Sequence, residues 1–188
     1  MSNYRRLYLQ GTYIFLTIVT HNRMPLLINN IELLRNAFKH TKTKFDFEIF
    51  ASVILPDHMH LMLKPDKIKE YPKIIGMIKH NFSRHIDTCR VGNCPPQELN
   101  PPALSQSKLK KREKGIWQRR YYEHTILNED DFAKHLDYIH FNPVKHELVN
   151  NVQDWEYSSF HKFVKMNYYE QNWGSLDDVK AIKEMNLE

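Results

Sequence analysis

The sequence has 188 residues, of which 41% are hydrophobic and 12% aromatic, and a formal net charge of +5. This length and apolar content suit one compact domain with a substantial core, and they exclude a disordered chain. We therefore expect a single domain over residues 1–188. No apolar run is long enough to span a membrane, and Cys89 and Cys94 have no second cysteine pair to complete a zinc ribbon. These two features predict a soluble, cytoplasmic protein.

The first predicted elements are a strand and a helix. Residues 12–20 are rich in β-branched and aromatic residues and are bounded by a glycine, which is typical of a strand. Residues 28–42 carry apolar side chains at helical spacing, and Asn29 or Asn30 can cap this helix.

A His-x-His motif opens the third predicted strand. Residues 45–55 predict a strand that a Pro-Asp turn sends back over residues 58–64. Side chains alternate along a strand, so His58 and His60 share one face, while Met59 and its apolar neighbours share the other. The two imidazoles can therefore bind one metal ion, but they are an incomplete ligand set.

Positive charge is concentrated in the middle of the chain. Residues 69–88 predict a helix with a basic polar face, and residues 90–116 contain two Pro-Pro pairs and predict a long loop. Residues 108–120 hold seven Lys or Arg residues and one Glu, which leaves the rest of the chain close to neutral. Trp117 within this stretch, and two tyrosines after it, favour a segment that binds nucleic acid, although a solvated basic loop is the alternative.

The last third of the chain is predicted to be mainly helical. Residues 116–127 are aromatic and predict a strand, and Asn128 can cap a helix that runs to about Phe141. Proline disfavours a helical conformation in the residue before it, so we expect Asn142-Pro143 to interrupt this helix. Two short helices should follow, over residues 144–149 and 158–166.

The helix that begins at residue 129 carries a second group of candidate site residues. Leu136 lies on its apolar stripe, and at about 100° per residue Tyr138 falls nearly opposite, outside the predicted core. Asn142 lies one turn further on the same face as Tyr138. The amide could complete a metal site with two histidines, and the phenol oxygen could attack a phosphorus atom that the metal polarises.

This ligand set predicts a divalent ion and phosphoryl transfer. Two imidazoles and an amide leave the charge of the ion available to a phosphate, which suits Mg²⁺ or Mn²⁺, although histidines also bind Zn²⁺. A His-x-His motif and a surface tyrosine also occur without function, so the residues alone leave the site open.

Several segments, taken together and in order, resemble one family. They are Asn3-Tyr4-Arg5-Arg6, Gly11-Thr12-Tyr13, VILPDHMHLML, GIWQRRYYEHTI, FAKHLDYIHFNPVKH, and the pattern from Asp154-Trp155 to Phe160. Over nearly its whole length the sequence resembles the REP-associated tyrosine transposases, a branch of the HUH single-tyrosine (Y1) transposases. The resemblance implies an α+β fold, an α/β sandwich with a ferredoxin-like or RRM-like core in which helices flank a central antiparallel β-sheet.

The same resemblance implies roles for four residues. His58 and His60 correspond to the HUH pair, Tyr138 to the nucleophile and Asn142 to the third metal ligand. Members of the family recognise imperfect palindromic repeats as single-stranded DNA hairpins and cleave near the hairpin foot through a 5′-phosphotyrosine link. A monomer is implied for this branch, whereas simpler relatives form dimers.

Two positions depart from the family pattern. Glu147 stands where a glycine is common, which puts the local turn in doubt if it needs a positive φ. Glu156 stands where a proline is frequent. Neither residue belongs to the proposed chemistry.

The leading hypothesis is a metal-dependent, single-stranded DNA endonuclease and strand transferase, associated with the nucleoid. Basic residues should hold the hairpin, mostly through phosphates: Arg5, Arg6, Lys79, Arg84, Lys108, Lys110, Lys111, Arg112, Arg119 and Arg120. The alternatives are a domesticated hairpin-binding protein that does not cleave and, less well supported by the basic run, a metal hydrolase for a small molecule.

Overall fold

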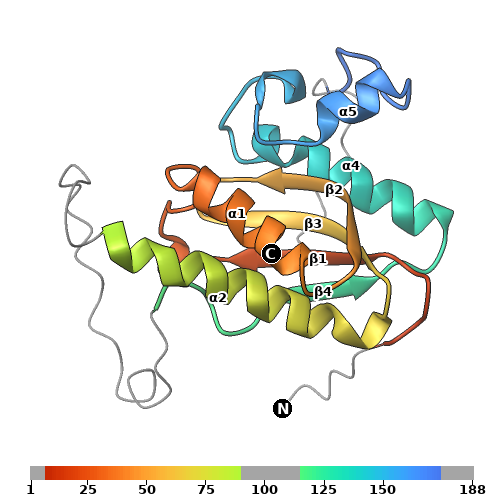
Figure 1. Cartoon of the computed structure of the whole chain (residues 1–188). Coiled ribbons are helices and arrows are strands. Elements are labelled where there is room, and N and C mark those ends of the chain that lie inside the picture. Colours follow the sequence, from red (N-terminus) through yellow and green to blue (C-terminus); the bar gives the residue numbers. More distant parts are fainter. Residues whose placement is uncertain (1–6, 90–114, 175–188) are drawn as a thin grey trace.

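The computed structural model describes residues 7–89 and 115–174 (Figure 1). Its four strands form one antiparallel sheet in the order β2-β3-β1-β4. They are β1 (Ile14–Val19), β2 (Phe47–Ile54), β3 (His58–Pro65) and β4 (Tyr122–Thr125). β1 and β3 pair along the whole of β1 at the centre of the sheet.

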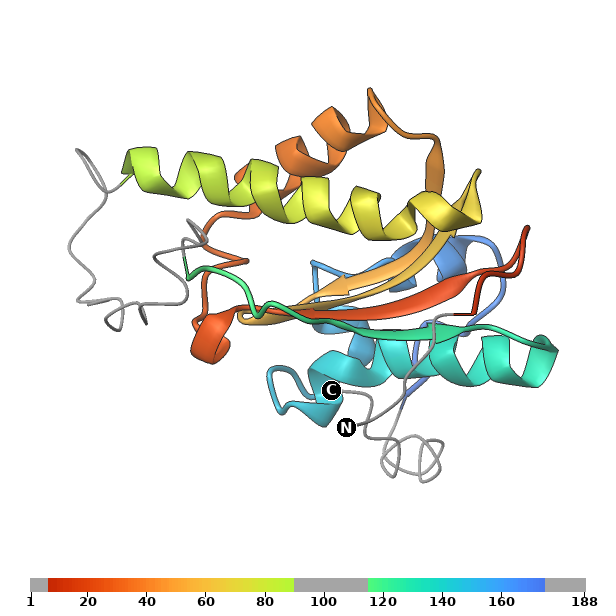
Figure 2. The same cartoon turned by 90° about the horizontal axis from the view of Figure 1, so that it is seen from below.

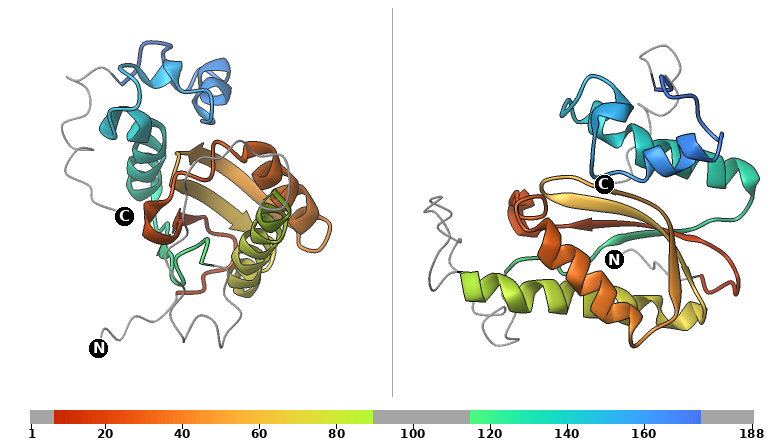
Figure 3. Two further views of the ribbon diagram at one scale, coloured as in Figure 1. Left: turned by 90° about the vertical axis from the view of Figure 1, so that its left-hand side faces the viewer. Right: turned by 45° about the horizontal axis from the view of Figure 1, so that its top comes forward.

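Helices cover both faces of this sheet. Figure 2 shows α1 (Ile31–Lys42) and α2 (Tyr71–Cys89) on one side and α4 (Glu129–Lys145) on the other, and the left panel of Figure 3 shows the same layers end-on. The short helix α5 (Phe160–Lys165) lies near α4, and three 3-10 turns complete the elements: η1 (His21–Arg23), η2 (Ile68–Glu70) and η3 (Val152–Asp154). The expected α/β sandwich with a central antiparallel sheet is confirmed. Within the described ranges, none of the helices combines the length and apolar character needed to cross a lipid bilayer.

Alternation along the two central strands divides the core. Side chains of one parity pack with α1 and α2: Ile14, Leu16, Ile18, Met59, Leu61 and Leu63. Phe15 and Met62, of the other parity, pack with α4 and α5. His58 and His60 lie four and two residues before Met62 on β3, so their side chains project from the same face of the sheet as Met62. They therefore lie in the layer between the sheet and α4.

The predicted break at Pro143 is wrong, because α4 continues through this residue to Lys145. Proline removes only one intrahelical hydrogen bond, and Asn142 and Pro143 are both buried. The carbonyl oxygens of Asn142 and Pro143 accept hydrogen bonds from the N–H groups of His146 and Leu148, at 3.0 and 2.9 Å. Tertiary packing therefore outweighs the local preference against a helix, and the expected separate helix over residues 144–149 is absent from this part of the structure.

The predicted strand over residues 116–127 is shorter than expected. Only β4 is regular, although Trp117 forms an isolated bridge with Thr20 beyond the end of β1. The Ile116 side chain enters the core below α2, and Trp117 packs 5.2 Å from Phe82 between ring centroids. These contacts turn the chain out of the sheet before β4 begins.

Candidate active site

The two histidines of β3 lie side by side beneath α4. His58 is 1% exposed and His60 is fully buried, and their ring centroids are 5.0 Å apart. In the register of the sheet, Val19 lies opposite His58, and Thr17 lies opposite His60. The predicted strand periodicity is thus confirmed, and both rings face the helix that carries Tyr138.

Neighbouring side chains bind the Nδ1 atom of each ring. His58 Nδ1 is 2.6 Å from Asp57 Oδ1, and His60 Nδ1 is 2.9 Å from the Thr17 hydroxyl. Burial raises the pKa of Asp57, but hydrogen bonds and charges of His58 and Arg23 outweigh this effect and hold the pKa below its usual value. The ionised carboxylate of Asp57 accepts a hydrogen bond from the Nδ1–H group of His58, which leaves the lone pair of this ring on Nε2. Such contacts orient histidines that bind a metal through their other nitrogen.

Tyr138 lies against this pair from the opposite layer. Its ring centroid is 5.2 Å from that of His60, and the two rings are nearly perpendicular. Tyr138 is fully buried, so the expectation that it lies outside the core is wrong. The reason is that Tyr138 itself faces the sheet, where its ring packs against Phe15 and His60, while Leu136 on the other side of α4 is buried as well.

Asn142 lies between two contacts of α4 with the histidines. Tyr138, one turn before it, meets His60, and His146, one turn after it, has its ring centroid 4.9 Å from that of His58. Asn142 is fully buried, and neither its side-chain oxygen nor its nitrogen has a hydrogen-bond partner among the described residues. Such a group costs about 1–3 kcal/mol unless a ligand satisfies it. A metal-bound amide oxygen would remove that cost, so the residues present fit a divalent ion.

Two residues at the end of α4 were not identified from the sequence. Lys145 Nζ donates a hydrogen bond of 3.2 Å to the hydroxyl of Tyr138 and lies 4.7 Å from the centroid of its ring. His146 is the residue that approaches His58. Lys145 and His146 follow Tyr138 by two helical turns, at i+7 and i+8. A prediction that the helix continues through Pro143 would have placed both residues on the same face as Tyr138.

A basic groove lies on the other face of the sheet, between α2 and the chain that leads to β4. This cavity of about 900 Å³ brings together three predicted DNA-binding residues, Lys79, Arg84 and Arg119, with Trp117 and Tyr121. Arg120 is exposed beside it but does not line it. The other predicted residues lie outside the described ranges, as does most of the expected long loop over residues 90–116: Arg5, Arg6, Lys108, Lys110, Lys111 and Arg112.

The groove and the histidines meet at one end of the sheet. The N–H of Gln118, beside the groove, donates to the carbonyl of Val19 at 3.0 Å, and the N–H of Thr20 donates to the carbonyl of Asp57 at 2.8 Å. Asp57 in turn holds His58. The groove and the layer beneath α4 are therefore linked at this end of the sheet through Val19, Thr20 and Asp57.

Comparisons with known proteins find relatives over nearly the whole chain. A sequence model described as "Transposase IS200 like" matches residues 9–91. A Haemophilus influenzae protein assigned to the REP-associated tyrosine transposases is 42% identical over 182 residues, which is 96% of this chain and 97% of that protein. The REP-associated tyrosine transposase of Escherichia coli K12 is 34% identical over 184 residues, 96% of each chain. A solved structure of a REP-associated tyrosine transposase bound to a REP hairpin has a TM-score of 0.73 and 34% identity, and covers 92% of this chain and 91% of that one.

Proposed function

This chain belongs to the REP-associated tyrosine transposases, and from that premise we propose that it cleaves and rejoins single-stranded DNA at hairpin-forming palindromic repeats. The observation that carries the proposal is the position of Tyr138, whose ring centroid is 5.2 Å from that of His60 in a layer that also holds an unsatisfied Asn142. The proposal treats residues 1–188 as one transposase domain that acts on DNA in the cytoplasm.

The proposed reaction is a reversible exchange of two esters. The oxygen of Tyr138 attacks phosphorus, an O–P bond forms, and the bond from phosphorus to the 3′ oxygen of the preceding nucleotide breaks. The phenol proton leaves to water, and the departing 3′ oxygen takes up a proton to become a free hydroxyl. Attack of a 3′ hydroxyl on the phosphotyrosine restores a DNA strand and the phenol.

The residues around Tyr138 divide the remaining tasks. The Lys145 ammonium stabilises the negative charge that develops on the tyrosine oxygen. His58, His60 and Asn142 would hold a divalent ion, which we propose to be Mg²⁺ or Mn²⁺ and which would withdraw charge from the non-bridging oxygens of the phosphate. Asp57 engages Nδ1 of His58 and Thr17 engages Nδ1 of His60, so Nε2 is the nitrogen that each histidine would offer to the ion.

The basic groove is proposed to hold the DNA. Lys79, Arg84 and Arg119 can bind phosphates, and Trp117 and Tyr121 offer aromatic faces on which unpaired bases stack. The REP hairpin bound in the related structure is the model ligand. The basic residues outside the described ranges belong to the same proposed surface.

A covalent-adduct assay tests the reaction. The full chain is incubated with labelled hairpin single strands in Mg²⁺, Mn²⁺ or chelator, and adducts are separated on a denaturing gel. We expect an adduct in either metal, none with chelator and none for Tyr138→Phe. Tyr122→Phe is the matched control, because Tyr122 lies across from Thr17 on the neighbouring strand but is 39% exposed and touches neither histidine in the described contacts. Hairpin binding without an adduct in any metal would leave only the non-cleaving alternative.

A salt titration tests the groove. We expect the triple variant Lys79→Ala/Arg84→Ala/Arg119→Ala to bind the hairpin more weakly and to lower the slope of log affinity against log salt by about 2. Three exposed lysines that do not line the groove provide the control triple, Lys39→Ala/Lys44→Ala/Lys165→Ala. Equal slopes for the two triple variants would place the DNA elsewhere.

A further inference from the structure

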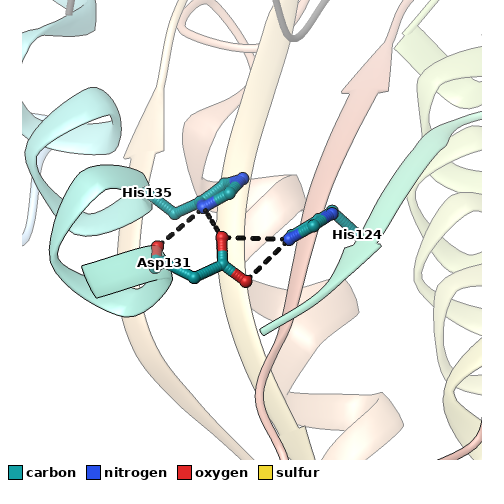
Figure 4. A group of neighbouring side chains, drawn as sticks. All are labelled: His124, Asp131 and His135. Atoms are coloured by element: carbon teal, nitrogen blue, oxygen red, sulfur yellow. Dashed lines mark hydrogen bonds and ion pairs between the residues drawn. The ribbon is translucent and has the colours of Figure 1, made fainter. Parts of the chain in front are cut away.

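A second group of side chains with potential metal ligand atoms lies on the same face of the sheet, where α4 begins. β4 contributes His124, and the first two turns of α4 contribute Asp131 and His135 (Figure 4). One ligand atom from each side chain lies within 4.8 Å of the others. None of the three is a proposed ligand of the first site.

The carboxylate of Asp131 lies between the two imidazoles. His124 Nε2 is 2.8 Å from Oδ2 and 3.0 Å from Oδ1, and His135 Nδ1 is 2.9 Å from Oδ1 and 2.8 Å from the backbone oxygen of Asp131. The rings are nearly parallel, with centroids 4.6 Å apart. Figure 4 shows that each ring turns one nitrogen toward the carboxylate.

The local structure holds this carboxylate in place. Asn128 caps α4 and accepts a hydrogen bond of 2.9 Å from the N–H of Asp131, while the N–H of Leu127 donates to Asp131 Oδ2 at 2.9 Å. Asp131 and His135 are one turn apart on the helix, and His124 lies opposite Phe15 in the sheet. The three ligands are therefore oriented before any ion arrives, which lowers the ordering cost of binding.

We propose that His124, Asp131 and His135 bind a transition-metal ion, with Zn²⁺ as the best match. Two imidazole nitrogens and one carboxylate oxygen are a ligand set typical of Zn²⁺, whereas Mg²⁺ prefers oxygen ligands. His135 is only 5% exposed, but the His124 side chain is 32% exposed and leaves a path for the ion. On binding, His124 Nε2 and His135 Nδ1 each offer a lone pair, and the ring proton of each neutral imidazole moves to its other nitrogen.

The ion would have a structural role close to the active site. It would join the edge strand β4 to α4 three residues before Tyr138. The ring of Phe15 has its centroid 4.8 Å from that of His135 and 5.6 Å from that of His60, so the two groups share one aromatic neighbour. The second site would thus fix the helix that carries the nucleophile against the sheet, and it does not depend on the proposed cleavage reaction.

Zinc titration by calorimetry tests the proposal on the full, untagged chain. His58→Ala/His60→Ala removes the first proposed ligand pair, so any remaining tight binding reports the second site. We expect this variant to bind one equivalent of Zn²⁺ and to show no response to Mg²⁺. Adding His124→Ala should weaken the affinity for Zn²⁺ at least tenfold, whereas adding His161→Ala, at an exposed histidine of α5, should not change it.

A second measurement guards against misfolding of the multiple variants. Nitrogen-15 spectra of the histidine rings in the otherwise wild-type chain should show His124 and His135 changing tautomer as Zn²⁺ is added. Zinc binding that is lost with His124→Ala and accompanied by this tautomer change supports the site. Absence of zinc binding in the double variant, or binding that persists after His124→Ala, overturns the proposal and leaves a hydrogen-bonded contact between β4 and α4.

Discussion

At the scale of single residues, Lys145 is the group that most directly affects the proposed nucleophile. Its ammonium both donates a hydrogen bond to the oxygen of Tyr138 and lies close to the face of its ring. A phenol is a weak nucleophile until it loses its proton, and a cation at this distance favours the charge that then develops. The rate of cleavage should therefore depend on Lys145 even though it does not bond to phosphorus.

The substitution Lys145→Met tests this role. We expect adduct formation to slow by roughly a hundred- to a thousandfold, which is the range for loss of one charge-stabilising donor. Lys145→Arg, which keeps the charge, should recover part of the rate. Rates are measured at saturating hairpin, and the hairpin affinity is measured separately. A variant that loses affinity but keeps the saturated rate would show that Lys145 holds DNA instead.

Asp137, beside the nucleophile in sequence, should make stability depend on pH. Its Oδ1 accepts a hydrogen bond of 2.6 Å from the hydroxyl of Tyr169. Burial raises the pKa of Asp137, and the hydrogen bond from Tyr169 only partly opposes this effect. The pKa of Asp137 is therefore higher in the native state than in the unfolded state. At neutral pH the ionised carboxylate lowers the free energy of unfolding, and this loss is relieved as the pH falls through the native pKa and the native carboxylate takes up a proton.

Replacing this carboxylate by its neutral isostere should therefore stabilise the protein. We expect Asp137→Asn to raise the free energy of unfolding at neutral pH, and we expect the gain to shrink near about pH 4. Urea unfolding at the two pH values measures it. Asp46→Asn removes an exposed carboxylate and is the control. A gain that is the same at both pH values would show that charge is not the cause.

At the scale of elements, α4 depends on the turn that ends it. The N–H of Glu147 donates to the carbonyl of Val144 at 3.0 Å, and that of Leu148 donates to the carbonyl of Pro143 at 2.9 Å. This is the hydrogen-bond pattern of a Schellman motif, in which the residue after the C-cap is left-handed and is usually glycine. Glu147 adopts a φ of 55°, so the turn forms in spite of the departure from the family's glycine.

The strain at this turn can be relieved by one substitution. A non-glycine residue in the left-handed region costs roughly 1–2 kcal/mol, and glycine loses about 0.5–1 kcal/mol more entropy on folding than other residues. We expect Glu147→Gly to raise the free energy of unfolding by about 0.5–1 kcal/mol, measured by urea or thermal unfolding. Glu147→Ala removes the same side chain without the freedom of glycine and should give no such gain. Equal effects of Gly and Ala would mean that the carboxylate, not the backbone, is responsible.

Local periodicity predicts part of the site but not its assembly. Alternation placed His58 and His60 on one face, and helical spacing placed Asn142 one turn after Tyr138; the structure contains both relationships. The burial of Tyr138 could not be predicted in this way, because it depends on α4 packing this face against the sheet, where Tyr138 meets Phe15 and His60. Lys145 was missed for a related reason, since its position follows from a helix that tertiary packing carries past a proline.

At the scale of the whole molecule, one chain supplies both halves of the candidate site. The contact between His60 on β3 and Tyr138 on α4 forms within a single copy, through a continuous described chain from β4 into α4. A dimer that exchanges this helix would instead pair the histidines of one copy with the tyrosine of the other. We propose a monomer as the active form, which is the oligomeric state that the family resemblance implies.

Mixing two inactive variants distinguishes these arrangements. His60→Ala keeps the tyrosine, and Tyr138→Phe keeps the histidines. If helices were exchanged, an equal mixture that had been unfolded and refolded together would assemble about a quarter of its sites with both groups intact. If each site forms within one chain, no mixture can restore an adduct, however long the copies exchange. We expect the mixture to form no covalent adduct on the denaturing gel. A wild-type sample refolded in parallel shows that refolding itself preserves activity. Adduct at about a quarter of the wild-type amount would mean that α4 crosses between copies.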